Sequence, residues 1–95
     1  QKKKRSNPNT VQLYQNYPNP FNPSTTISFS LNKQEKVTLE VFNMAGQLVE
    51  TVTNQIYNGG SHSITFRAEN LASGVYFYRL KTSASTQTKK FTLIK

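Results

Sequence analysis

The fold of this chain is decided by the stretch LASGVYFYRLK, residues 71–81. In an extended strand, successive side chains point to opposite faces. Tyr76, Tyr78 and Leu80 would therefore share one apolar face. Phe77 and Arg79 belong to the opposite face, which is mixed in character. The stretch predicts a strand with one buried face in the interior of a sheet.

The same period of two recurs from Thr26 to the last residue, and no window favours a helix. Turn sequences separate the apolar runs, at residues 43–46, 58–60 and 83–86. The predicted strands cover residues 26–31, 36–41, 48–53, 62–67, 75–81 and 89–95. Short strands at such regular intervals predict an all-β fold, an immunoglobulin-like antiparallel β-sandwich of about seven strands.

Three residues are assigned to maintenance of this fold. The spacing Leu71-x-x-Gly74-x-Tyr76 is that of a tyrosine corner, in which a tyrosine hydroxyl bonds to the backbone a few residues upstream. A plain core tyrosine is the alternative. Gly46 is the fourth residue of the turn that starts at Asn43, where a positive φ closes a type I turn with a bulge. Replacement of Gly46 should therefore lower the stability of the domain more than a substitution at an ordinary surface position.

Length and composition predict one domain with a linker in front of it. The chain has 95 residues and no Cys, and residues 1–10 are basic and polar with no apolar side chain. We interpret residues 1–10 as a linker and residues 11–95 as the domain. The stretch from Tyr17 to Ser24 holds three prolines, which predicts order without helix or central strand. Pro18, Pro20 and Phe21 join the residues assigned to fold maintenance.

The charge balance is strongly basic but does not favour a nucleic-acid partner. Twelve basic residues face four acidic ones, giving a net charge of +8, and four of the positive charges are in Lys2–Arg5. The remaining basic residues fall on separate predicted strands, and no helix is predicted to enter a groove. No apolar run is long enough for a transmembrane segment.

Catalytic and metal-binding chemistry has little material here. The chain contains one His, four Glu and no Asp or Cys, and no spacing among them makes a carboxylate pair or a metal site. Ser61 and Ser63 flank His62, but neighbours on a strand face opposite ways. Gly59-Gly60 leads into a strand and not into a helix, so it predicts a turn. We expect neither an enzyme nor a cofactor.

The aromatic residues leave one binding alternative open. Phe42, Phe77 and Tyr57 would form a stacking platform for a polysaccharide if they shared an exposed face. The chain would then be an accessory carbohydrate-binding or adhesion module of a secreted hydrolase. A purely structural spacer is a further alternative.

Four ordered pieces of the chain resemble a known family. They are residues 17–23 (YPNPFNP), 41–49 (VFNMAGQLV), 71–78 (LASGVYFY) and 89–95 (KKFTLIK). From Leu13 to Lys95, the chain resembles the type A C-terminal sorting domain of type IX secretion system cargo, found on exported proteins of Bacteroidota. The resemblance implies an immunoglobulin-like, non-catalytic signal that directs an attached cargo to the cell surface or medium.

The resemblance also implies partners and a route. Family members cross the periplasm, are recognised by the outer-membrane type IX translocon, and are in many cases cut by a surface sortase. The sortase releases the cargo or attaches it to anionic lipopolysaccharide. Residues 1–10 correspond to the linker in which such a cut falls, although no motif identifies the bond.

The last predicted strand supplies the candidates for translocon recognition, namely Lys89, Lys90, Phe91 and Lys95. A terminal strand at a sheet edge would offer unpaired backbone groups for strand addition, and its lysines would steer it toward an acidic partner. Ordinary protection of the edge against self-association is the alternative role of these lysines.

Overall fold

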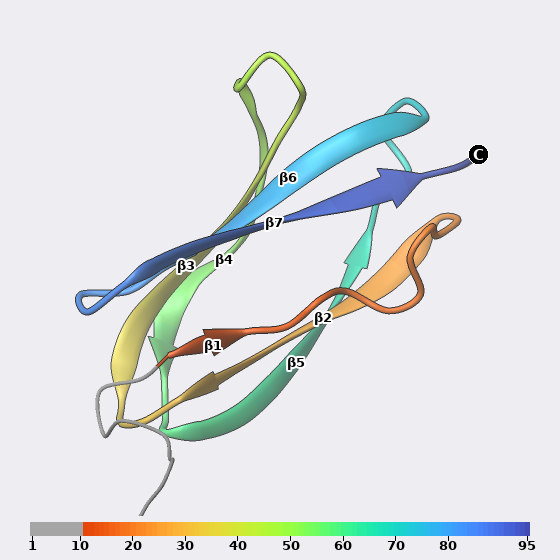
Figure 1. The fold of residues 1–95 in the computed structure, drawn as a ribbon. Helices are drawn as coiled ribbons and strands as arrows, with labels where there is room; N and C mark the ends of the chain where they lie inside the picture. The colour runs from red at the N-terminus through yellow and green to blue at the C-terminus, as the bar shows by residue number, and fades with distance from the viewer. Residues whose placement is uncertain (1–10) are drawn as a thin grey trace, which may run out of the picture.

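A computed structural model describes residues 11–95 and contains seven strands and no helix in that range (Figure 1). The linker predicted for residues 1–10 lies outside the described residues. The strands are β1 (Gln12–Leu13), β2 (Ser24–Leu31), β3 (Glu35–Phe42), β4 (Leu48–Tyr57), β5 (Gly60–Arg67), β6 (Gly74–Lys81) and β7 (Thr86–Leu93).

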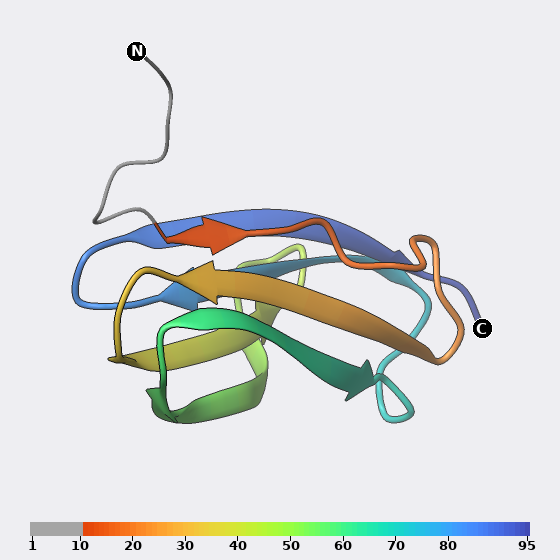
Figure 2. The same ribbon diagram turned by 90° about the horizontal axis from the view of Figure 1, so that it is seen from below.

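The strands form two antiparallel sheets that face each other (Figure 2). One sheet has the order β1-β2-β5, and the other has the order β4-β3-β6-β7. β6, which carries the stretch quoted first, is paired on both sides, with β3 and with β7. The predicted all-β antiparallel sandwich is confirmed, and so is the interior position of this strand.

The core lies between the sheets and contains the side chains that the alternation assigned to the apolar faces. Buried residues alternate with intermediate or exposed ones along β2 and β3, as expected for strands with one covered face. Tyr78, Phe29, Phe66 and Phe91 are the largest side chains with almost no exposed surface. Phe21 lies outside the main strands but belongs to the same core, 4.9 Å from Phe91 between ring centroids.

Local geometry confirms the corner and the turn. The Tyr76 hydroxyl donates a 2.6 Å hydrogen bond to the carbonyl oxygen of Ala72. Tyr76 therefore forms a tyrosine corner and is not simply a core residue. Gly46 has a φ of +84°, and its N–H donates to the Asn43 carbonyl at 3.0 Å. Gly74 has a φ of +155°, a backbone conformation that residues with a side chain rarely adopt.

The strand boundaries differ from the sequence-based expectations by one or two residues in β2, β3, β5 and β6 and by more in β4 and β7, and one strand was not expected. β7 begins at Thr86 and ends at Leu93, because its pairing with β6 continues to the turn at residues 82–85. β4 continues to Tyr57, and its pairing with β3 contains two irregularities of the β-bulge type. β1 was not expected. It has only two residues, which is too short for an alternating pattern, and it is defined by its pairing with β2.

Candidate functional site

The candidates on β7 are divided between its two faces. Lys89 is paired with Tyr78 and Phe91 with Tyr76, so both face the inner side of the sheet, whereas Lys90 is paired with Phe77 on the outer side. Lys89 is half-buried and Lys90 is exposed. The two lysines are neighbours in sequence but present their charges on opposite sides of the strand.

Phe91 is a core residue and not a surface residue. Its side chain is 0% exposed and stacks on Tyr76 and Tyr78, with ring centroids 5.5 and 5.9 Å away. In the folded domain its ring is out of reach of a partner. Its contribution to any recognition is therefore to hold β7 in place.

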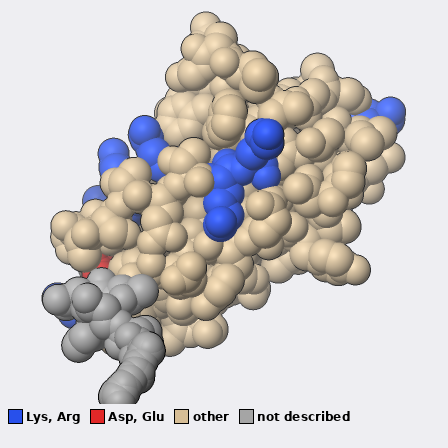
Figure 3. All heavy atoms as spheres, in the orientation of Figure 1, with Lys and Arg blue, Asp and Glu red and all other residues tan. Residues whose placement is uncertain are grey.

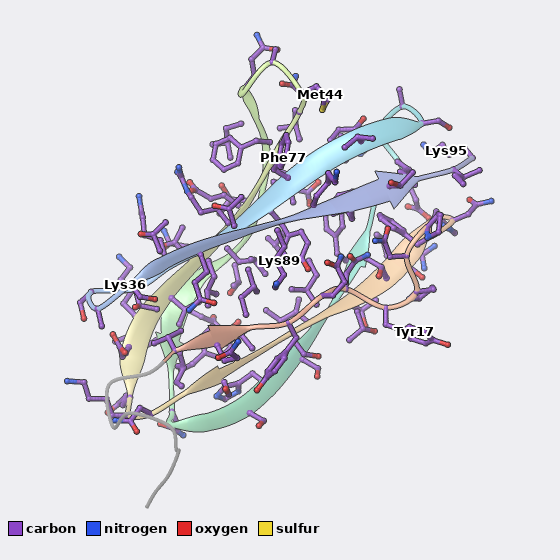
Figure 4. The ribbon with its side chains drawn as sticks, in the orientation of Figure 1. Tyr17, Lys36, Met44, Phe77, Lys89 and Lys95 are labelled. Atoms are coloured by element: carbon purple, nitrogen blue, oxygen red, sulfur yellow. The ribbon has the colours of Figure 1, made fainter. Side chains whose placement is uncertain are left out.

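Lys95 follows β7 and is tied to the loop before β6. Its backbone N–H donates to Ser73 Oγ at 2.9 Å, and its Nζ donates to the carbonyl oxygen of Glu69 at 2.7 Å. The Arg67 guanidinium, bonded to the Glu69 carboxylate at 2.6 Å, holds the pKa of that carboxyl below its usual value, and Lys95 adds to the effect. Lys95 anchors the last residues to the body of the domain (Figure 4).

The edge of β7 is covered, contrary to the expectation of an open edge. Residues 11–21, which we call the strap, run beside β7 from end to end (Figure 2). The Thr92 N–H donates to Asn19 Oδ1 at 2.9 Å, and the Thr92 carbonyl accepts the Phe21 N–H at 3.1 Å. Gln15 Nε2 donates to the Lys90 carbonyl at 2.8 Å. Covering an edge with an irregular segment satisfies its backbone groups without adding a full strand.

Gln87 connects the beginning of the strap to β7. Its Nε2 donates to the Val11 carbonyl, and its Oε1 accepts the Leu13 N–H at 2.9 Å. One side-chain amide thus replaces the two backbone groups that a neighbouring strand would offer. The sequence analysis missed this residue, because a glutamine in a polar run carries no signal of its own.

Asn16 and Tyr78 hold the middle of the strap. The Tyr78 hydroxyl donates to the Tyr14 carbonyl at 2.8 Å and accepts the Asn16 N–H at 2.9 Å. Asn16 Nδ2 donates to the Pro18 carbonyl at 3.1 Å and to Thr25 Oγ1 at 3.0 Å. Burial raises the pKa of Tyr78 to about 12, against a smaller lowering by the bond from Asn16. The proline-rich stretch is thus fastened to the core through the Pro18 carbonyl, although Pro18 and Pro20 are both exposed.

Basic groups dominate the side of the molecule that β7 crosses. Figure 3 shows Lys and Arg side chains over the middle of this side and almost no acidic group. Two of the four glutamates are paired with arginines: Glu40 with Arg79 at 3.0 Å and Glu69 with Arg67 at 2.6 Å. A third, Glu35, is buried and accepts a hydrogen bond from Ser83 at 2.8 Å. Most of the acidic charge is therefore already engaged within the domain.

The other sequence candidates are separated in space. Tyr57 packs against Phe29 and His62 on the inner side of the sandwich, whereas Phe42 and Phe77 are paired with each other on the outer face. The three aromatic residues do not make one platform. Within residues 11–95, no group of three or more His, Asp or Glu side chains is placed to hold a metal ion. No helix in that range is long and apolar enough to cross a membrane.

The sequence profile of the family described as "Secretion system C-terminal sorting domain" matches residues 15–95. The chain belongs to this family. The match confirms the resemblance to type IX sorting domains drawn from the four ordered motifs, and it extends over both sheets and most of the strap.

Two solved structures have the fold of this sorting domain. Dimeric latent PorU from Porphyromonas gingivalis is 19% identical to it, with a TM-score of 0.70 over 88% of the chain. PorZ from the same bacterium, described as an essential surface component of the type IX secretion system, is 21% identical, with a TM-score of 0.61 over 87% of the chain. The chain spans only 9% and 11% of the lengths of these two proteins. Among curated proteins, no match is found.

Membership of the family establishes the role of the domain in outline. It is a sorting signal and not a catalytic unit, and it serves export of an attached protein to the cell surface or the medium. Such a role requires contact with the secretion machinery through the surface of a folded sandwich.

Proposed function

We propose that this domain is read in the periplasm by the outer-membrane type IX translocon and that Lys89 and Lys90 on β7 provide the charge that is read. The covered edge of β7 is the observation that carries the proposal. The strap already satisfies backbone groups of Thr92 and Lys90, so protection of that edge does not require lysines. Lys90 is exposed and Lys89 is half-buried, and their charges would steer the domain toward an acidic partner.

Phe91 and Lys95 have supporting roles in this proposal. Phe91 fixes β7 through the core, and Lys95 fastens the chain beyond β7 to the loop before β6. Together they hold the two lysines at constant positions, which lowers the entropic cost of binding.

We further propose that residues 1–10 join the domain to its cargo and contain the bond that a surface sortase cuts. The cargo would then be released or attached to anionic lipopolysaccharide. Sequencing of the new termini after export of a fused reporter tests this step, and a cut after residue 10 would contradict it.

The experiment on recognition uses a fluorescent reporter delivered to the periplasm and fused to residues 1–95, in a host with a working type IX system. Removal of residues 89–95 would also delete the core residues Phe91 and Leu93, so point variants are required. The double variant Lys89→Glu and Lys90→Glu should lower the exported fraction by about tenfold or more. The double variant Lys33→Glu and Lys36→Glu makes the same change of charge elsewhere and should be exported normally.

Thermal unfolding of the purified variants provides the control for folding. Equal export of both double variants, with equal Tm values, would contradict the role of Lys89 and Lys90. Retention of the unmodified fusion in the periplasm, with the domain folded, would contradict recognition by the translocon.

A further inference from the structure

The outer face of the four-stranded sheet is apolar at one end. Register places Leu48, Phe42, Phe77 and Lys90 in one row that crosses β4, β3, β6 and β7. Val75 lies next to Phe77 on the same face of β6. We call Phe42, Leu48, Val75 and Phe77 the apolar band.

The band is not required by the core of the sandwich. Its members belong neither to the buried core nor to the partly buried residues that pack against it. Leu48 is 52% exposed, and Met44, in the turn of the same hairpin, is 67% exposed (Figure 4). An antiparallel sheet with one solvated face normally carries polar side chains there. A contiguous apolar group on that face is typical of an interaction site.

Positive charge borders the band at two places, at Lys90 on β7 and at Arg79, the next residue after Phe77 on the same face of β6. Lys90 ends the row, and the Arg79 guanidinium lies 4.5 Å from the centroid of the Phe42 ring. Glu40 is the one acidic residue that the described strands place on this face, and Arg79 pairs with it at 3.0 Å. A surface that is apolar in the centre and positive at the rim is complementary to an apolar surface with carboxylates at its rim.

The strap does not cover this surface. Its hydrogen bonds to β7 go to the strand edge and to the inner side chain of Gln87. Val11, where residues 1–10 join the described domain, is bonded to Gln87, three positions along β7 from Lys90 and toward its Thr86 end. A cargo connected through residues 1–10 therefore joins the domain away from the band.

We infer that the apolar band, with Lys90 at its rim, docks an acidic protein surface of the secretion machinery that presents apolar side chains between carboxylates. The inference rests on the proposed function and specifies which face of the domain is read. It assigns the contact to the outer face of the sheet, and it separates Lys90 from Lys89, which faces inward.

The reporter fusion tests this inference. The double variant Leu48→Ser and Phe77→Ser should lower the exported fraction by about tenfold, because central apolar residues carry most of the energy of an interface. Ile56→Ser is the matched control, since Ile56 is 63% exposed and lies on the same face of β4, paired with Lys36 far from the band. It should be exported like the unmodified fusion.

A second pair of variants changes only charged surface residues, so its result is not affected by a loss of stability from replacing apolar side chains. Lys90→Glu should lower export strongly, whereas Lys81→Glu, on the same face at the far end of β6, should leave it unchanged. A greater loss with Lys81→Glu than with Lys90→Glu would contradict the location of the rim.

The outcomes separate this inference from the proposed function. If the unmodified fusion is exported and the folded band variant is exported equally well, the band is not the docking face, while the sorting role stands. Retention of the unmodified fusion contradicts both. The alternatives are that the purified domain binds an insoluble polysaccharide through the band, or dimerises through it in sedimentation experiments. Either property, present in the unmodified domain and lost in the band variant, would assign the band to that partner and overturn the inference.

Discussion

The two edge strands of the four-stranded sheet differ: the edge of β7 is covered by the strap, whereas the edge of β4 is open among the described residues. β7 carries lysines, and the strap covers its edge with hydrogen bonds from Asn19, Phe21 and Gln15. β4 carries no lysine and pairs only with β3 among the described strands, with exposed apolar side chains at both ends. The lysines are therefore not on the strand whose edge is open, where edge protection alone would place them. Because the strap already covers the edge of β7, the lysines of this strand are not needed to protect it.

The largest expected contrast between the edges concerns the core. Phe91→Ala on β7 should cost about 3–5 kcal/mol of unfolding free energy, because it removes a fully buried ring and leaves a cavity. Ile56→Ala on β4 should change the stability by less than about 0.5 kcal/mol, because that side chain is mostly exposed. Urea denaturation measures both values. Similar losses for the two variants would break the comparison.

The next contrast depends on pH and on the hydroxyl that holds the strap. The pKa of Tyr78 is about 12 in the folded domain, whereas an unfolded tyrosine titrates near 10. Between these values the unfolded chain releases the proton first, so stability is fully present below pH 10 and falls as the pH rises toward 12. The loss should reach about 2 kcal/mol.

Denaturation curves from pH 9 to pH 12 check this expectation, with Tyr78→Phe as the comparison. The variant should be less stable at pH 9, because it loses the bonds to Tyr14 and Asn16, and it should lack the contribution of Tyr78 to the decline. Parallel curves for the two proteins would show that this hydroxyl does not titrate differently on folding.

The smallest contrast concerns the clamp at the beginning of the strap. Gln87→Ala should cost about 1–2 kcal/mol, because the Val11 carbonyl and the Leu13 N–H lose their partner. Gln55→Ala, at an exposed position of β4, should be nearly neutral. Amide hydrogen exchange at Leu13 should accelerate in the Gln87 variant alone. Unchanged exchange there would mean that the strap is held without the clamp.

Side-chain orientation on β7 was within reach of the sequence. Strict alternation already places Lys89 with Phe91 and Lys90 on the other side, because strand geometry has a period of two. Grouping the lysines by charge and proximity to the C-terminus obscured this division. Burial of Phe91 follows from the same alternation and is a better prediction than its placement on a recognition surface.

What the sequence determined by itself was local and periodic. Alternation set the strands and their apolar faces, the spacing from Leu71 to Tyr76 set the corner, and Gly46 set the turn. These features depend on residues within a few positions of one another. The tertiary structure alone decided that the strap covers β7 and that Leu48, Phe77 and Lys90 form one row. These hydrogen bonds between the strap and β7 join residues more than 70 positions apart, and no local pattern encodes a pairing that only the closed sandwich brings together.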